Sequence, residues 1–162
     1  MSGVLVTVVP PAMYDFASLT NTNGITMTFV VASRIDTTGA ESGVLQVRAH
    51  TITLTNSGDR IDVDVSLHGY TPDDPGTDYG QVGASMANVN FLAPLSPGAP
   101  LYKTTALTGR FGGQLKVTVK ATRGNNMLTA LQAKLSIDLM LKTGGAARYP
   151  MARLPGTFLG YA

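Results

Sequence analysis

The stretch LQAKLSIDLMLK, residues 131–142, decides the fold class of this chain. Every second residue is apolar, and the residues between them are polar apart from Met140. On a β-strand the six alternating apolar side chains share one face, whereas on an α-helix the polar ones would fall into two opposite arcs and leave no clean apolar stripe. The stretch therefore predicts a half-buried strand, although Met, Leu, Ala, Gln and Lys favour helices.

The same alternation recurs upstream and predicts an all-β fold. Residues 61–68 and 115–122 also alternate apolar and polar side chains. Further strands are expected at 4–9, 25–33, 44–55, 86–92 and 101–107. Seven or eight strands separated by Gly, Asn and Pro, with no convincing helix, indicate an antiparallel sandwich or barrel. We expect a jelly-roll-like antiparallel β-sandwich.

Two short segments between alternating runs are predicted to be hairpin turns. They are Asn56–Asp59 and residues 123–126, and both contain Gly and Asn. These residues tolerate the positive φ that hairpin turns need. Each segment is therefore expected to join neighbouring antiparallel strands.

Three segments lack a strand pattern. Residues 10–24 are predicted to be a link, and residues 69–85 a long loop rich in Gly, Pro and Asp. Residues 143–162 carry aromatic and apolar side chains that a solvated tail normally lacks. We expect residues 1–162 to form one domain with 143–162 as an extended arm that grips a neighbouring copy. The alternative is an arm folded over its own sandwich.

The two halves of the chain carry opposite charge. Residues 1–81 hold nine acidic and three basic side chains, a net −6, and residues 82–162 hold one acidic and nine basic ones, a net +8. Complementary potentials steer encounter and fix register. We therefore expect two poles through which copies attract each other head to tail. Charged residues make up only 14% of the chain, which leaves much neutral surface for contacts.

Targeting signals and cysteine chemistry are absent from the sequence. It contains no cysteine, which excludes disulfides and thiolate metal sites. Residues 1–9 lack the basic region and cleavage site of a signal peptide, and no stretch reaches the ~18–20 apolar residues of a membrane helix. We expect synthesis in the cytoplasm, no secretion by a signal peptide and no membrane partner.

Acidic residues are the candidates for metal or catalytic chemistry. Asp62 and Asp64 are predicted on one strand face, and Asp73, Asp74 and Asp78 follow in the next loop. Calcium takes several such oxygen ligands, but the spacing does not match the twelve-residue calcium loop. Two carboxylates on a wet strand face also do not resemble a glycosidase pair, in which one acid needs an apolar cleft. A solvated or partner-facing acidic patch is expected, with calcium binding as the alternative.

No catalytic signature is present elsewhere. His50 and His68 are the only histidines, the G-x-S-x-G nucleophile motif is missing, and the glycine-rich residues 109–113 lack the Lys-Ser/Thr of a phosphate loop. Lys116 and Lys120 could follow a phosphate backbone, but exposed aromatic residues for base stacking are missing around them. We therefore expect no enzyme, no cofactor, no resident metal and no nucleic-acid partner.

These observations favour a structural, self-assembling protein. It would be a virion, capsid, decoration or tail-type shell subunit that forms symmetric homo-oligomers and contacts other shell proteins. The alternative is a carbohydrate- or ligand-binding β-sandwich module. Aromatic and arginine side chains dominate interface hot spots, and loop acids would face basic groups across an interface. The predicted interface residues are Asp73, Asp74, Asp78, Arg148, Tyr149, Met151, Arg153, Leu154, Phe158 and Tyr161.

Overall fold

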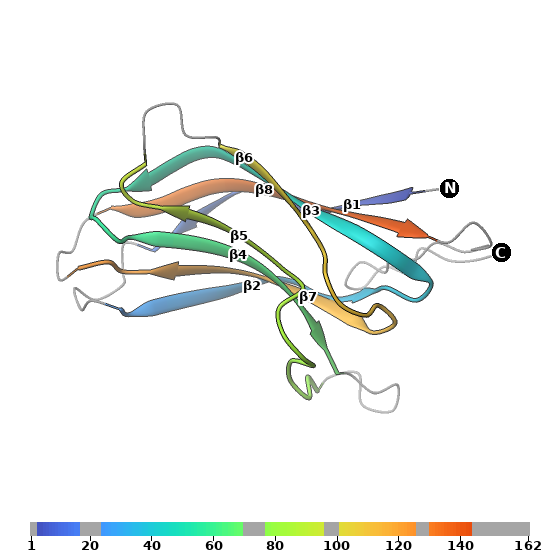
Figure 1. Ribbon diagram of the computed structural model, residues 1–162. Helices are drawn as coiled ribbons and strands as arrows, with labels where there is room; N and C mark the ends of the chain where they lie inside the picture. Colours follow the sequence, from blue (N-terminus) through green and yellow to red (C-terminus); the bar gives the residue numbers. More distant parts are fainter. Residues whose placement is uncertain (1–2, 17–23, 70–76, 96–100, 126–129, 144–162) are drawn as a thin grey trace.

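Eight β-strands make up the regular structure of the chain (Figure 1). The computed structural model describes residues 3–16, 24–69, 77–95, 101–125 and 130–143. The strands are β1 Gly3–Asp15, β2 Thr26–Asp36, β3 Ala40–Leu54, β4 Arg60–His68, β5 Ala87–Leu92, β6 Tyr102–Ala106, β7 Gln114–Thr122 and β8 Leu131–Thr143. Within these ranges there is no helix, so none that could cross a membrane. The predicted all-β class is confirmed.

The strands form two four-stranded antiparallel sheets that pack face to face (Figure 1). One sheet has the order β1-β8-β3-β6, and the other has the order β2-β7-β4-β5. The pairs β1–β8, β2–β7, β3–β6 and β4–β5 are all antiparallel, as in one long hairpin folded across two layers. This is the strand arrangement expected of a jelly roll. The predicted antiparallel sandwich is confirmed.

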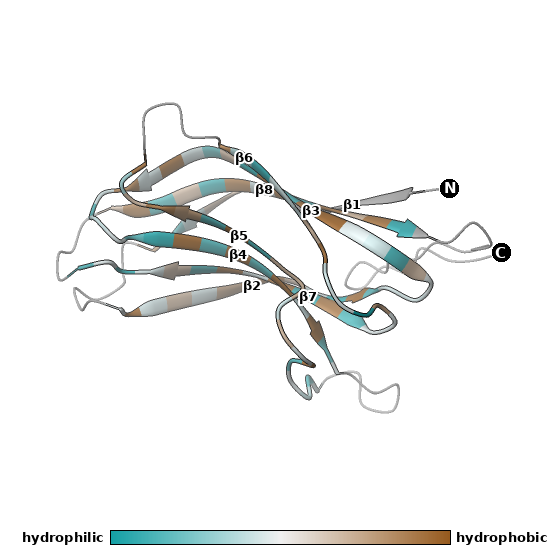
Figure 2. Cartoon of the chain, viewed as in Figure 1, coloured by the Kyte–Doolittle hydropathy of each residue, from teal (hydrophilic) through white to brown (hydrophobic). Residues whose placement is uncertain are grey.

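The core lies between the two sheets and is built from the alternating residues. All six apolar residues of the deciding stretch on β8 are fully buried, and strands of the facing sheet contribute equally buried side chains. Figure 2 shows the alternation of apolar and polar residues along β3, β4 and β8. Full burial of one such aliphatic side chain stabilises the fold by about 1.5–3 kcal/mol. The fully buried set includes Leu131, Ala133, Leu135, Ile137, Leu139, Leu141, Ile61, Val63, Val65, Leu115, Val117 and Val119.

Both predicted hairpin turns are wrong, because each segment connects strands of different sheets. Asn56–Asp59 leads from β3, which pairs with β6 and β8, to β4, which pairs with β5 and β7. The segment that begins at Arg123 leads from β7 to β8, again from one sheet to the other. Gly58 does have a positive φ of 84°. Turn residues thus mark where the chain reverses but not which sheet it enters.

The predicted link over residues 10–24 is wrong for its first part. β1 continues through Pro10 and Pro11 to Asp15, and its register with β8 shifts between Val9 and Ala12. β1 is the last strand of its sheet, where a missing backbone N–H is tolerated. Residues 17–23 lie outside the described residues.

The opposite charges of the two halves do not form two poles in the described strands. In both sheets, strands of the acidic half alternate with strands of the basic half. Lys120 is in register with Asp62 on the neighbouring strand, and Arg123 pairs with Asp59. The described strands therefore form no separate acidic and basic poles, because the fold places strands of the two halves side by side.

Candidate functional site

A chain of hydrogen-bonded side chains lies on the outer face of β4 and β7. His68 is bonded to Ser66 Oγ through Nε2 at 2.9 Å and to Asp78 Oδ1 through Nδ1 at 2.8 Å. Lys116 Nζ donates to the other Asp78 oxygen at 2.8 Å. Ser66 and His68 share a face because they are two residues apart on β4, and Lys116 is in register with Ser66. Asp78 therefore ties the β4–β5 connection to this sheet.

The charges around Asp78 stabilise its ionised form. The hydrogen bond from Lys116 and, next, the one with His68 hold the pKa of the Asp78 carboxyl well below its usual range. The backbone N–H of Gly80 donates to the same carboxylate at 2.8 Å. Asp78 was predicted to face a basic group across an interface, and the basic group it contacts here belongs to its own chain. Asp73 and Asp74 lie outside the described residues.

The hydrogen-bonded order Ser66–His68–Asp78 is that of a hydrolytic triad, but the serine is not accessible as a catalytic serine must be. Ser66 is only 3% exposed, so its hydroxyl cannot meet a substrate carbonyl in this conformation. The arrangement acts as a structural contact between strand and loop. No pattern in the sequence indicates this contact, because Asp78 approaches β4 through an irregular loop.

The Asp78 contact predicts a pH-dependent contribution to stability. Because the pKa is lower in the folded chain, the stabilisation is complete above the unfolded value, about 3.9, and is lost as pH falls from there toward the folded pKa. We expect Asp78→Asn to lower the free energy of unfolding by about 1 kcal/mol near pH 7. The gap from the unchanged chain should narrow steadily as the pH falls below about 4.

Thermal unfolding at several pH values checks this expectation. The matched control is Asp64→Asn, because Asp64 is half-buried on the same strand and its carboxylate accepts a hydrogen bond from the Ser85 hydroxyl at 3.1 Å. The control should change little across the same range. A deficit of Asp78→Asn that stays constant down to about pH 2 would contradict the assignment.

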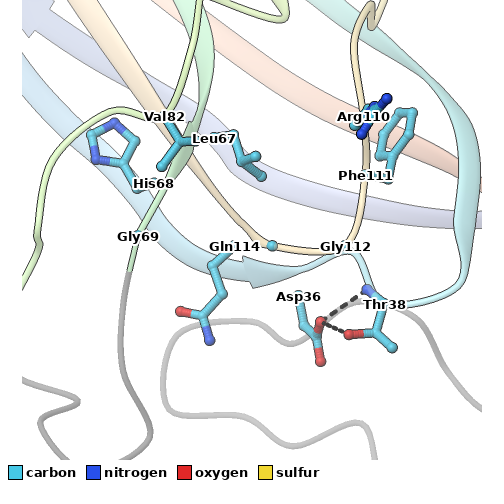
Figure 3. A pocket seen from close by; sticks show the side chains of 11 residues that line it. Asp36, Thr38, Leu67, His68, Gly69, Val82, Arg110, Phe111, Gly112 and Gln114 are labelled. Atoms are coloured by element: carbon cyan, nitrogen blue, oxygen red, sulfur yellow. Dashed lines mark hydrogen bonds between the residues drawn. The ribbon is translucent and has the colours of Figure 1, made fainter.

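A pocket of about 470 Å³ lies at the same end of the sandwich (Figure 3). Its walls come from the end of β2, the end of β4, and the connection from β6 to β7. In Figure 3, Leu67 and Val82 form one wall and Arg110 and Phe111 another. Both apolar and polar side chains line it, among them Leu67, Val82, Phe111, Asp36, Arg110 and Gln114. Pockets of this size and mixed lining suit small ligands.

The sandwich has an open side where the edge strands β1 and β2 lie. In the described residues β1 pairs only with β8, and β2 pairs only with β7. The rings of Tyr14, Phe16 and Phe29 cluster across this side, with centroids 5.3–6.5 Å apart. The apolar side chains that remain exposed there are Met13, Ile25, Phe29 and Val30, with 37–58% of their surface in contact with solvent. An edge of this kind can take up a further strand.

The remaining candidates have partners within the chain. Asp62 accepts hydrogen bonds from Arg60 Nε and Nη2, at 2.8 and 2.6 Å, and His50 is bonded to Ser136 at 3.1 Å. Asp62 and Asp64 do share the outer face of β4, as predicted. Among the described residues, no group of three or more His, Asp or Glu could hold a metal ion. The predicted interface residues between 148 and 161 lie outside the described residues.

Comparisons with known proteins bear on the fold. No protein-family model matches the chain, and no curated protein matches it either. Among solved structures, the chain is similar to the VP2 subviral particle of infectious bursal disease virus, with a TM-score of 0.50 and 13% sequence identity. The match covers 90% of this chain but 33% of the viral one. A structure of the Gx strain of the same virus matches with a TM-score of 0.47 and 12% identity over 90% of this chain and 32% of that one.

The chain thus spans about a third of the length of the solved structures that it matches. At this level of identity the likeness shows the fold alone. It agrees with the sandwich described above, in which two four-stranded antiparallel sheets pack together. It assigns no site residue, because the positions that it aligns differ in most side chains.

Proposed function

We propose that this chain is a structural subunit of a virion or similar shell that assembles into symmetric homo-oligomers. The observation that carries the proposal is the open side of the sandwich, where the β2 edge, which pairs only with β7 among the described residues, coincides with exposed apolar side chains. The fold likeness to a viral particle protein supports it as an analogy. The partner would be a second copy of the chain, joined by other shell proteins in the particle.

The β2 edge fits such a partner better than the β1 edge does. β1 carries Pro10 and Pro11, which remove backbone donors and guard an edge against pairing. β2 has no proline, and its first part, Thr26–Val30, keeps regular register with β7. Addition of a strand from a neighbour would pair the outer backbone groups of this stretch, which have no strand partner in the described part of the chain, and cover Val30, which is 55% exposed.

A lysine at the β2 edge is expected to disrupt assembly. Val30→Lys places a charge beside the unpaired edge, so it should shift the oligomer toward single chains by at least about tenfold in association constant. Light scattering coupled to size-exclusion chromatography measures the mass. Val82→Lys is the matched control, because Val82 is also 55% exposed but lies at the pocket end. A single-chain mass for the unchanged protein at high concentration would overturn the proposal.

The same measurement distinguishes assembly through the β2 edge from assembly through the predicted C-terminal arm. We also propose that residues 143–162 grip a neighbouring copy, as their aromatic and arginine content suggests. A variant without residues 144–162 should associate more weakly while its unfolding transition is retained. If it associates as well as the full chain, the arm has no part in assembly and the β2 edge alone carries it.

A further inference from the structure

We propose that the pocket at the end of β2, β4 and the β6–β7 connection binds a saccharide ring. This activity goes beyond assembly and does not depend on it, because every lining residue belongs to one chain. Gln114 Oε1 is buried and accepts no hydrogen bond within the part of the chain that the structure describes. Buried acceptors are rarely left in this state without a cause.

The position of Gln114 relates this acceptor to the pocket. Gln114 begins β7, is in register with His68 on β4, and lines the pocket together with it. Gln114 follows Gly112 and Gly113, whose backbone forms part of the wall. Once a rotation of the Gln114 side chain turns this buried oxygen toward the pocket, a ligand hydroxyl would supply the donor that it lacks. The site therefore favours a ligand that carries hydroxyl donors.

Two further polar side chains would form hydrogen bonds with other hydroxyl groups of the ligand. Asp36 supplies a carboxylate, which accepts at 2.9 and 2.7 Å from the N–H and hydroxyl of Thr38 (Figure 3). These bonds fix the orientation of the carboxylate at the pocket mouth. Arg110 supplies a guanidinium with several donors. One acid and one base leave these two side chains with no net charge, which disfavours a phosphate and suits a neutral polyhydroxylated ring.

The apolar part of the lining suits the C–H face of such a ring. Phe111 offers an aromatic face, and Leu67 and Val82 lie on the other wall (Figure 3). The polar groups of the lining would orient the ligand, while the contacts with these three apolar side chains would bury one face of the ring. A volume of about 470 Å³ is in the usual range for small-ligand sites.

The two connections that form the pocket are tied together before any ligand arrives. Thr37 is fully buried, donates its hydroxyl to the carbonyl of Gly113 at 2.7 Å, and accepts from the N–H of Gly112 at 3.1 Å. Gly113 also packs closely on Leu67, since a Cβ there would lie 2.8 Å from Leu67 Cδ1. A preformed site loses less free energy on binding than one that must be ordered.

The test is a titration of the full chain with a panel of neutral hexoses, amino sugars and acidic sugars, with inorganic phosphate as a separate probe. Ligand-observed NMR and calorimetry at up to about 10 mM detect weak binding. We expect at least one neutral saccharide to bind and Arg110→Ala to weaken it by about tenfold or more. Val30→Lys, on the distant β2 edge, is the control and should bind as the unchanged chain does.

Gln114→Leu distinguishes a role of Gln114 in ligand binding from a purely structural role. Replacing an unsatisfied buried acceptor with an apolar side chain of similar size should raise the unfolding midpoint by a few degrees and abolish binding. Binding of phosphate alone, or of no saccharide at all, would overturn the proposal. So would a Gln114→Leu variant that binds normally. A single-chain mass would end the assembly proposal but leave this one standing.

Discussion

Replacing Asp59 with alanine is expected to lower the free energy of unfolding by about 3–5 kcal/mol. Asp59 is fully buried at the start of β4, and its Oδ2 lies 3.5 Å from Nη1 of Arg123, which is also fully buried. Its two oxygens also accept from the backbone N–H groups of Asn56 at 3.0 Å and Gly124 at 2.9 Å. Loss of the carboxylate removes the negative charge opposite the buried guanidinium. It also removes the acceptors of two backbone N–H groups, and together these losses explain the large effect.

The contact holds three chain connections together at the end of the sandwich away from the pocket. Asp59 and Asn56 belong to the connection from β3 to β4, and Arg123 begins the one from β7 to β8. Arg123 also bonds through its backbone to Ile25 and Gly24, at 2.9 Å each, just before β2. The ion pair therefore fixes how both sheets are joined, not only one turn.

Urea unfolding of Asp59→Ala against Asp64→Ala measures the effect. Asp64 is more exposed and should cost at most about 1 kcal/mol. The double variant Asp59→Leu with Arg123→Met should recover much of the loss, because no buried charge then remains. If Asp59→Ala is no less stable than Asp64→Ala, the buried pair does not hold the connections.

Strand positions could be predicted from the sequence because burial repeats every second residue. Leu131 to Leu141 alternate without a break, so the pattern identified both the strand type and the buried face. The weaker stretches 86–92 and 101–107 were also located within a residue or two, as β5 and β6. Local periodicity is enough to predict strand positions, because the polarity of each side chain indicates whether that side chain is buried.

Sheet membership could not be predicted, because it depends on pairing between distant strands. β3 and β4 are consecutive, yet they belong to different sheets, and nothing in Asn56–Asp59 distinguishes a hairpin from a crossing. Asp59 and Arg123 carry opposite charges within the two turn segments, but only the folded chain shows that they form an ion pair. Similarly, the pocket combines Asp36, Leu67 and Gln114, which are far apart in sequence. Only the three-dimensional strand order brings them together.

Replacing Gly124 with alanine is expected to lower the free energy of unfolding by more than about 4 kcal/mol, a large part of the roughly 5–15 kcal/mol of an ordinary domain. A Cβ on Gly124 would overlap backbone atoms of Ser57, Gly58 and Asp59. Backbone atoms cannot rotate aside as a flexible side chain can, so the two connections would have to separate. That separation would break the hydrogen bond from the Gly124 N–H to Asp59 and pull the carboxylate away from Arg123.

Circular dichroism of the purified variants, followed through thermal unfolding, measures the effect. Gly69→Ala is the matched control, because a Cβ there would meet Tyr79 and Val82 at an ordinary 3.7 Å. The control should fold with a midpoint close to that of the unchanged chain or slightly above it, since alanine restricts the unfolded state. A Gly124→Ala variant that unfolds cooperatively within a few degrees of the control would show that the connections are not in close backbone contact. Gly124→Ala should also be less stable than Asp59→Ala, because the steric overlap separates the two connections entirely while the carboxylate deletion removes only one side of their contact.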